Sequence, residues 1–247
     1  RIIEALQFLL AERFQWGVIY SVRNGTEEVR LRSQSKQSGR PRLREPIQFF
    51  GGHDLTGCMW LLFSKYLEYV LSENTNAWHP ISSHVYRACE ASCLSLDLQR
   101  LGLSVAVEGI LASCFKGAAV RDDRDNAAIQ ELQSHLAPWT GMDGWVGNDR
   151  LKERMSGLLG MLGGVSAKER LNALGASGEI EPSEIKAWSK LRNASVHPEQ
   201  HDPSATQEVL NLIGSVTTLM NKLVFKAIGY NGKYNDYGVP GWPAKDF

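Results

Sequence analysis

The chain has 247 residues, with 27 lysines and arginines against 27 aspartates and glutamates, and 43% of its residues are hydrophobic. A chain of this length and apolar content can bury a core in one or two globular domains. Its formal net charge of zero excludes a bulk electrostatic attraction to nucleic acid or anionic membranes, so any such partner has to meet a local patch.

The apolar stretches and the cysteines further narrow the class of protein. Stretches such as 59–63 are far shorter than the roughly 20 residues of a membrane span, and no basic-then-apolar leader opens the chain. We therefore expect a cytoplasmic protein with no membrane partner. All four cysteines fall in predicted helices, in a chain too long to depend on disulfides, so we expect reduced thiols. Because the chain opens at Arg1 rather than Met, we expect it to be a piece of a longer protein or an ordered subset of one.

The first fifty residues predict a small α+β segment. Apolar residues recur at helical spacing over 2–10, and the segments 16–23 and 26–34 flank Asn24-Gly25, a dipeptide that favours a tight hairpin turn. A short helix followed by a β-hairpin is expected. We treat residues 1–50 as an N-terminal segment separate from the helical domain that follows.

The segment 33–45 predicts a loop or linker. It is polar, contains Gly39 and Pro41, and carries three arginines at 40, 42 and 44. The arginines could contact phosphates, and the alternative is an ordinary solvated surface loop.

From Asp54 to Gly229 the pattern is helical. Asp54 and Asn148 are expected as helix caps, and the pairs Ser166/Glu169 and Ser204/Gln207 as capping boxes. We predict a mainly α fold, with residues 51–247 as one helical domain that ends in an irregular, aromatic tail from residue 230. The expected helices are 54–69, 82–93, 97–115, 125–136, 148–162, 166–175, 182–197 and 204–228.

The most informative segment is the predicted helix that runs from Pro182 toward His197. At 100° per residue, Ile185, Trp188 and Arg192 share one face, so the guanidinium of Arg192 is expected to project from an apolar surface. An ionised arginine there needs a carboxylate, a backbone carbonyl or an incoming phosphate.

Asn193 and His197 follow Arg192 closely. His197 lies about 140° around an ideal helix from Arg192, so the two side chains converge only if the last turn distorts or if two copies of the chain meet. Pro198 favours a distortion of that turn. Asn193 is four residues before His197, close enough to orient its imidazole or to bind the same ligand.

The run Arg192-Asn193-x-x-x-His197 resembles the Arg-x4–6-His motif of the HEPN superfamily, whose members are helical bundles. The stretch Val105-Ala-Val-Glu108-Gly109 and the aromatic tail 230–243 look like the ApeA-type branch, which is found in bacterial antiphage proteins. The resemblance covers about 82–243, and residues 1–50 look like the end of a larger preceding ApeA domain. It implies a HEPN-like helical bundle that forms a homodimer with an active site shared between the two chains.

The resemblance also implies a function: a metal-independent endoribonuclease without a cofactor, acting on RNA in antiphage defence, with tRNA as one candidate substrate. Its activity would be held off until a phage-derived trigger appears. In such an enzyme the RNA 2′-hydroxyl attacks the neighbouring phosphate. His197 from each of two chains would supply the base and the acid, Arg192 would balance the charge on phosphorus, and Asn193 would position the phosphate.

A structural interpretation stays open beside the catalytic one. Arg192 could form a buried ion pair, with Glu108 as the best candidate partner, and a carboxylate there could also hold a catalytic arginine in place. His197 could act as a favourable cation at a helix C-terminus. The chain would then be a noncatalytic HEPN module for dimerisation or ligand sensing.

Two further sets of residues have competing interpretations. Cys89 and Cys93, one helical turn apart, could share zinc with His79, His84 or Cys58, although buried helical cysteines are more often small core residues. Two tryptophans, at 139 and 145, fall in a predicted Gly-rich loop, where they could stack on bases or cover the loop end of the bundle.

Overall fold

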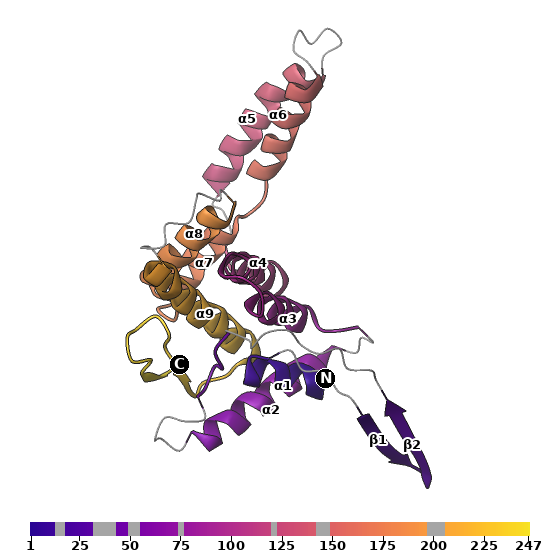
Figure 1. The fold of residues 1–247 in the computed structure, drawn as a ribbon. Coiled ribbons are helices and arrows are strands. Elements are labelled where there is room, and N and C mark those ends of the chain that lie inside the picture. Colours follow the sequence, from indigo (N-terminus) through magenta and orange to yellow (C-terminus); the bar gives the residue numbers. More distant parts are fainter. Residues whose placement is uncertain are drawn as a thin grey trace.

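The computed structural model describes residues 1–12, 18–31, 43–48, 55–73, 77–119, 123–141, 149–196 and 206–247. Over these residues the chain is mainly helical, with a β-hairpin after the first helix, as the sequence predicts (Figure 1). The helices within these ranges are α1 (Ile2–Leu10), α2 (Thr56–Ser72), α3 (Pro80–Ser92), α4 (Leu96–Cys114), α5 (Asp123–Gly141), α6 (Asp149–Leu162), α7 (Ala167–Gly175), α8 (Pro182–Val196) and α9 (Thr206–Ile228).

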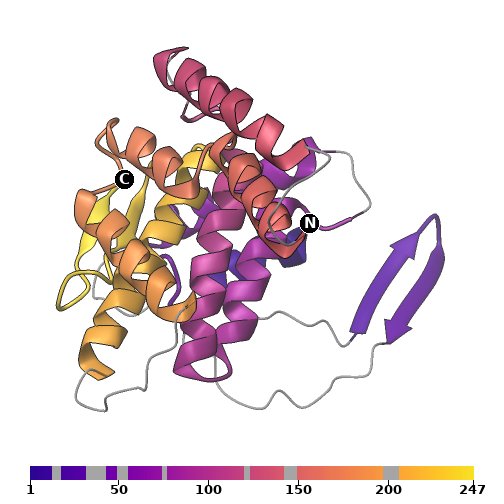
Figure 2. The same cartoon turned by 90° about the horizontal axis from the view of Figure 1, so that it is seen from above.

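The N-terminal hairpin forms around the predicted turn. Strands β1 (Val18–Arg23) and β2 (Thr26–Leu31) pair antiparallel. Asn24 and Gly25 between them have φ of 50° and 77°, and positive φ at both central residues is what a two-residue turn of the favoured twist requires. The hairpin stands away from the helices in two perpendicular views (Figures 1 and 2).

Several helix ends follow local signals that the sequence displays. Ser166 and Glu169 form the predicted capping box of α7, each side chain accepting a backbone N–H of the other residue. Pro182 is the first residue of α8, where its missing N–H costs nothing. Gly229 follows the last residue of α9 with a φ of 68°, as a helix-terminating glycine does.

Other predicted boundaries are wrong or lie outside the described residues. The N-cap position of α2 is Leu55, which offers no side-chain cap, and Asp54, Asn148 and Ser204 are outside the described ranges. Helix α5 continues beyond the predicted end at residue 136 to Gly141.

One hydrophobic core joins the first helix to the bundle. The ring of Phe8 in α1 stacks on Tyr66 of α2 with centroids 5.1 Å apart, and meets Phe225 of α9 edge to face at 6.1 Å. Leu43 and Ile47 belong to the same core. The core therefore runs across residue 50, where the sequence suggests a domain boundary.

Helices α3 and α4 pack closely because small residues line their contact. A Cβ atom on Gly102 would overlap the Cβ of Ala91, and one on Gly109 would overlap the imidazole of His84. The two glycines are seven residues apart, so they lie on one face of α4. This close contact sets the position of Glu108, the neighbour of Gly109.

The C-terminal tail is ordered rather than irregular, which corrects the prediction. Strands β3 (Lys233–Asn235) and β4 (Ala244–Asp246) pair antiparallel. The backbone N–H of Asn235 donates to the Pro46 carbonyl at 3.0 Å, and the Asn235 side chain accepts from the Gln48 N–H at 2.8 Å. These bonds join the tail to the segment 43–48, almost two hundred residues earlier in the chain.

Helices α5 and α6 form a separate hairpin that projects from the body of the bundle (Figure 1). Several of its apolar side chains are exposed, among them Leu132, Leu158 and Met161. Within the described ranges, each helix is too short or too polar to span a bilayer.

Candidate functional site: an exposed arginine between two helices

Helix α8 places Arg192 at the border of its buried face. The buried residues of α8 include Trp188 and Leu191, whereas the Arg192 side chain is 46% exposed. The expectation that the guanidinium is removed from water is therefore wrong. On the helical wheel Arg192 lies about 40° from Trp188 and 100° from Leu191, so it sits at the edge of the stripe, from which its long side chain reaches solvent.

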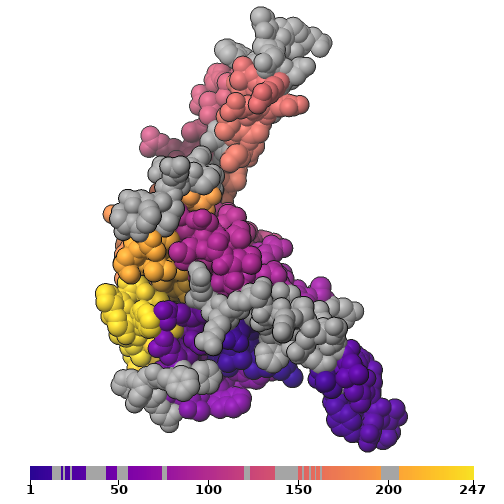
Figure 3. Space-filling model, viewed as in Figure 1, coloured from indigo at the N-terminus to yellow at the C-terminus, as the bar shows by residue number. Residues whose placement is uncertain are grey.

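Arg192 is held by the carboxylate that the sequence suggests. Its Nε donates to Oε1 of Glu108 on α4 at 2.6 Å, which confirms the pairing. The Glu108 side chain is 38% exposed, so the pair is a surface tie and not the buried ion pair of the structural interpretation. Figure 3 shows the surfaces of α8 (orange) and α4 (magenta) side by side on one face of the molecule.

The ion pair leaves part of the guanidinium free. An arginine has five N–H donors, and Glu108 takes the one on Nε. Within the described part of the chain, the two Nη groups have no hydrogen-bond partner. An arginine fixed at Nε and open at both Nη groups can still form two parallel hydrogen bonds to a phosphate.

The structure describes Asn193 but not His197. Asn193 is exposed on α8, next to Arg192, and its amide has no hydrogen-bond partner among the described residues. Helix α8 ends at Val196, and His197 lies outside the described residues. The structure therefore brings Arg192 and Glu108 together and leaves Asn193 exposed about 100° around α8 from Arg192, while the place of His197 stays a prediction.

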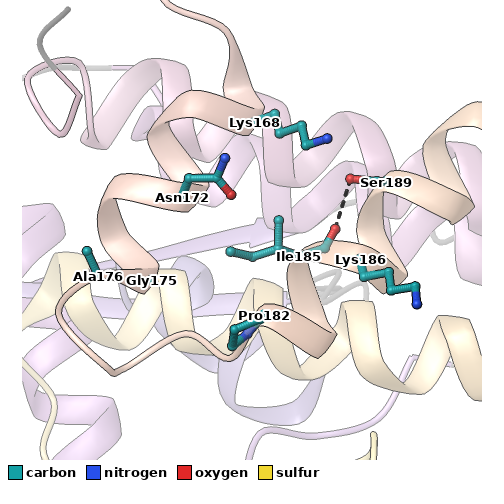
Figure 4. A pocket seen from close by; sticks show the side chains of 8 residues that line it. All are labelled: Lys168, Asn172, Gly175, Ala176, Pro182, Ile185, Lys186 and Ser189. Carbon is teal, nitrogen blue, oxygen red and sulfur yellow. Dashed lines mark hydrogen bonds between the residues drawn. The ribbon is translucent and has the colours of Figure 1, made fainter. Parts of the chain in front are cut away.

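A hollow of about 500 Å³ lies between α7 and α8, on the same side of α8 as Asn193. Figure 4 shows Ile185 pointing into it, with Lys168 and Asn172 on the α7 side and Ser189 on the α8 side. Its lining residues are Lys168, Asn172, Gly175, Ala176, Pro182, Ile185, Lys186 and Ser189. The hollow combines an apolar floor with cationic and amide groups at its rim.

The residues of this hollow were not predicted from the sequence, although a signal was present. Lys186, Ser189 and Asn193 follow one another at spacings of three and four on α8, so they form a polar row on one helix face. Lys168 and Lys186 are exposed, and neither has a carboxylate within ion-pair distance in the described ranges. This polar row begins at the hollow, with Lys186 and Ser189, and ends at Asn193, the residue after Arg192.

The alternative zinc site does not assemble. Across the described ranges, which include all five of its candidate ligands, no three metal-binding side chains lie close enough to hold a metal ion. All four cysteines are free. Cys89 is fully buried, and that burial raises the pKa of its thiol, while Cys93 donates its S–H to the Cys89 carbonyl at 3.4 Å.

The remaining sequence-based candidates contribute no group to the Arg192 surface. Burial, with a smaller contribution from the charge of Arg87, lowers the pKa of His84. Trp139 falls within α5 rather than in the predicted loop, its side chain is not described, and Trp145 lies outside the described residues.

Comparison with known proteins adds no family. No protein-family model, no curated protein and no solved structure matches the chain. The function is therefore inferred from the residues and their geometry.

Proposed function

We propose that this protein is a metal-independent endoribonuclease of HEPN type, which cleaves RNA at a cleft between two copies of the chain. The observation that carries the proposal is the surface pair of Arg192 and Glu108, in which a carboxylate holds the guanidinium by Nε and leaves both Nη groups open. Charge on phosphorus in the transition state is stabilised by donors that are already in place.

The proposed reaction starts with the 2′-hydroxyl of RNA. Its oxygen attacks the adjacent phosphorus, the bond from phosphorus to the 5′-oxygen breaks, and a 2′,3′-cyclic phosphate is left. One His197 removes the 2′-hydroxyl proton, and His197 of the second copy protonates the leaving 5′-oxygen. Arg192 binds the phosphate oxygens, Asn193 positions the same group, and Glu108 keeps Arg192 in place.

The hollow between α7 and α8 supports RNA as the substrate. Its lysines and the amide of Asn172 continue the row that ends at Asn193, and such groups bind a phosphate backbone without reading its sequence. Following the HEPN resemblance, the proposal includes a role in antiphage defence, with the activity held off until a phage-derived trigger appears and with tRNA among the candidate substrates.

Cleavage of a labelled RNA in the presence of EDTA tests the proposal. The expected products carry 2′,3′-cyclic phosphate ends, identified by mass spectrometry, and a substrate with deoxyribose at the cleaved position stays intact. Because a trigger is part of the proposal, the reaction is run with and without an extract of phage-infected cells, against the extract alone.

Matched variants assign the activity to the site. His197→Ala should abolish cleavage at an unchanged melting temperature, whereas His135→Ala, on the exposed face of α5, should keep it. If His197→Ala leaves cleavage intact, or if its main effect is to unfold the chain, the catalytic assignment is wrong.

A noncatalytic helical module is the second candidate, and one observation favours it: the Arg192–Glu108 pair joins α8 to α4. An exposed ion pair contributes only about 0.2–1 kcal/mol. If that tie is the purpose of Arg192, the double variant Arg192→Leu/Glu108→Leu should preserve dimerisation, and no RNA product should appear under any condition.

A further inference from the structure

A polar groove lies apart from the α7–α8 hollow, where α9, the segment 43–48 and the C-terminal tail meet. It consists of two adjoining hollows of about 550 and 720 Å³. Four residues line both hollows, which makes them one continuous groove: Gln207, Asn211, Tyr237 and Trp242. Its size is in the range of small-molecule sites.

The walls of the groove are fixed by contacts between distant parts of the chain. Gly214 of α9 lets the tail lie against the helix, because a Cβ atom there would overlap the backbone of Tyr237. The Tyr237 N–H donates to Thr218 at 2.9 Å, and its hydroxyl donates to the Glu45 carbonyl at 2.5 Å. The groove is therefore built before any ligand arrives.

The amide of Gln99 is the group in the groove that most strongly indicates a ligand. Gln99 projects from α4, is only 2% exposed and, with Arg44, lines the hollow of about 550 Å³. Its side chain has no hydrogen-bond partner in the part of the chain that the structure describes. Its amide oxygen and nitrogen are therefore available as an acceptor and a donor for a ligand in the groove.

Two further amides stand at the first turns of α9. Gln207 Nε2 donates to Asn211 Oδ1 at 2.9 Å, which holds both side chains in place. The bond leaves the Gln207 oxygen as an acceptor and the Asn211 nitrogen as a donor. Paired donors and acceptors of this kind match the hydrogen-bonding edges of nucleobases.

The groove also offers planar groups. The guanidinium of Arg44 lies 3.6 Å from the ring centroid of Trp242, and the Tyr237 ring meets Trp242 edge to face at 5.9 Å. Bases stack on aromatic rings and on guanidinium planes. Arg44 has one acidic neighbour in the lining, Glu45, so the groove is close to neutral and favours an uncharged, planar ligand over a bare anion.

We propose that this groove binds an unpaired base of a nucleotide, with Gln99, Gln207 and Asn211 on its edge and Arg44 and Trp242 against its face. In a single-stranded RNA, such a base would anchor the strand away from the Arg192 surface. The same chemistry could come from a free nucleotide, and the test below separates the two sources. The inference extends the proposed function, and its test measures binding without cleavage.

Fluorescence anisotropy with labelled 2′-O-methyl RNA hexamers of each base tests the proposal on the full chain. Such strands lack the 2′-hydroxyl and cannot be cleaved by the proposed reaction, so a failure of the nuclease assay leaves this measurement meaningful. At least one homohexamer should bind, and a hexamer of abasic sugar-phosphate should bind about tenfold more weakly. Adenosine monophosphate, guanosine monophosphate, cytidine monophosphate and uridine monophosphate are tested as competitors and, by calorimetry, alone.

Variants assign the binding to the groove. Gln99→Leu replaces an amide that has no partner, so it should weaken hexamer binding about tenfold without lowering the melting temperature. Trp242→Ala should have a similar effect on binding, and Trp242→Phe should restore most of it. Trp60→Ala is the matched control, since Trp60 is 65% exposed on α2 and does not line the groove.

Each outcome decides the proposal. Base-dependent binding that Gln99→Leu weakens supports an RNA strand as the ligand, and binding of a mononucleotide without binding of any hexamer supports a free nucleotide in the same groove. Equal binding of the abasic hexamer, unchanged binding in both the Gln99 and Trp242 variants, or no binding of any probe would overturn it.

Discussion

Lys222 of α9 and Glu184 of α8 form a buried ion pair, with Nζ 2.8 Å from Oε1 and with the side chains only 4% and 7% exposed. Lys222 also lies 5.6 Å from the ring centroid of Tyr234 in the tail. The pair thus joins α8, which carries Arg192, to the helix that lines the groove. Its charges are separated from water and depend on each other.

Removing one partner of this pair should destabilise the fold. Lys222→Met leaves the Glu184 carboxylate buried without its cation, and breaking a buried pair in this way costs about 3–5 kcal/mol of unfolding free energy. Denaturant titration measures the loss. The double variant Lys222→Met/Glu184→Gln should recover most of it, because no buried charge then remains; a double variant as unstable as the single one would contradict this account.

The same pair predicts a loss of stability at alkaline pH. Burial by itself lowers the pKa of Lys222, but the hydrogen bonds and charges of Glu184 and Tyr234 together outweigh it, so the pKa lies above its ordinary value of 10.5. A lysine whose folded pKa is raised contributes stability that is complete below pH 10.5 and is lost as the pH rises through the folded value. Melting temperatures above pH 10 should fall more steeply for the natural chain than for the double variant.

Gly102 is expected to tolerate no side chain. In Gly102→Ala the new Cβ would overlap the Cβ of Ala91, a stiff neighbour, so α3 and α4 must separate at a cost of about 1–3 kcal/mol. The control is Gly157→Ala on α6, where nothing lies within 4 Å and alanine should stabilise the helix by up to about 1 kcal/mol. Adding Ala91→Gly to Gly102→Ala should restore part of the stability. Thermal unfolding of the four proteins decides the point.

Arg192 and Lys190 should separate activity from stability. Both are exposed cations on α8 that pair with a carboxylate, Lys190 with Glu208 at 3.5 Å, so replacing either by alanine should change the unfolding free energy by no more than about 1 kcal/mol. Under the proposed function, Arg192→Ala lowers RNA cleavage about 100-fold or more, and Lys190→Ala does not. Equal cleavage by the two variants would remove Arg192 from the chemistry.

Glu108→Gln should give a smaller, distinct defect. It removes the charge that orients Arg192 but keeps a side chain of the same shape, so cleavage should fall about tenfold, the order seen when an orienting partner is lost. Single-turnover rates of Glu108→Gln, Arg192→Ala and the double variant measure the coupling. A double variant no slower than Arg192→Ala alone indicates that Glu108 acts through Arg192, and fully multiplicative losses would show that it acts independently.

Local signals in the sequence were sufficient for many elements. Asn24-Gly25 predicts the hairpin turn, Ser166 with Glu169 the start of α7, and Gly229 the end of α9, because each acts on a backbone only a few residues away. The same reasoning suggested Glu108 as the partner of Arg192, from the face that each occupies on its helix. It overestimated the burial of Arg192, since a helical wheel shows direction but not what lies beyond the side chain.

What the sequence by itself determined is therefore the helical class, most helix boundaries, the turn of the first hairpin and the pairing of one arginine with one glutamate. Only the tertiary structure decided that Arg192 lies at the surface, that the tail pairs into β3 and β4, and that Arg44, Gln99, Gln207 and Trp242 line one groove. Those four residues come from parts of the chain up to about two hundred positions apart. Which of them meet depends on how whole helices pack, and no interaction between near neighbours in the sequence encodes that.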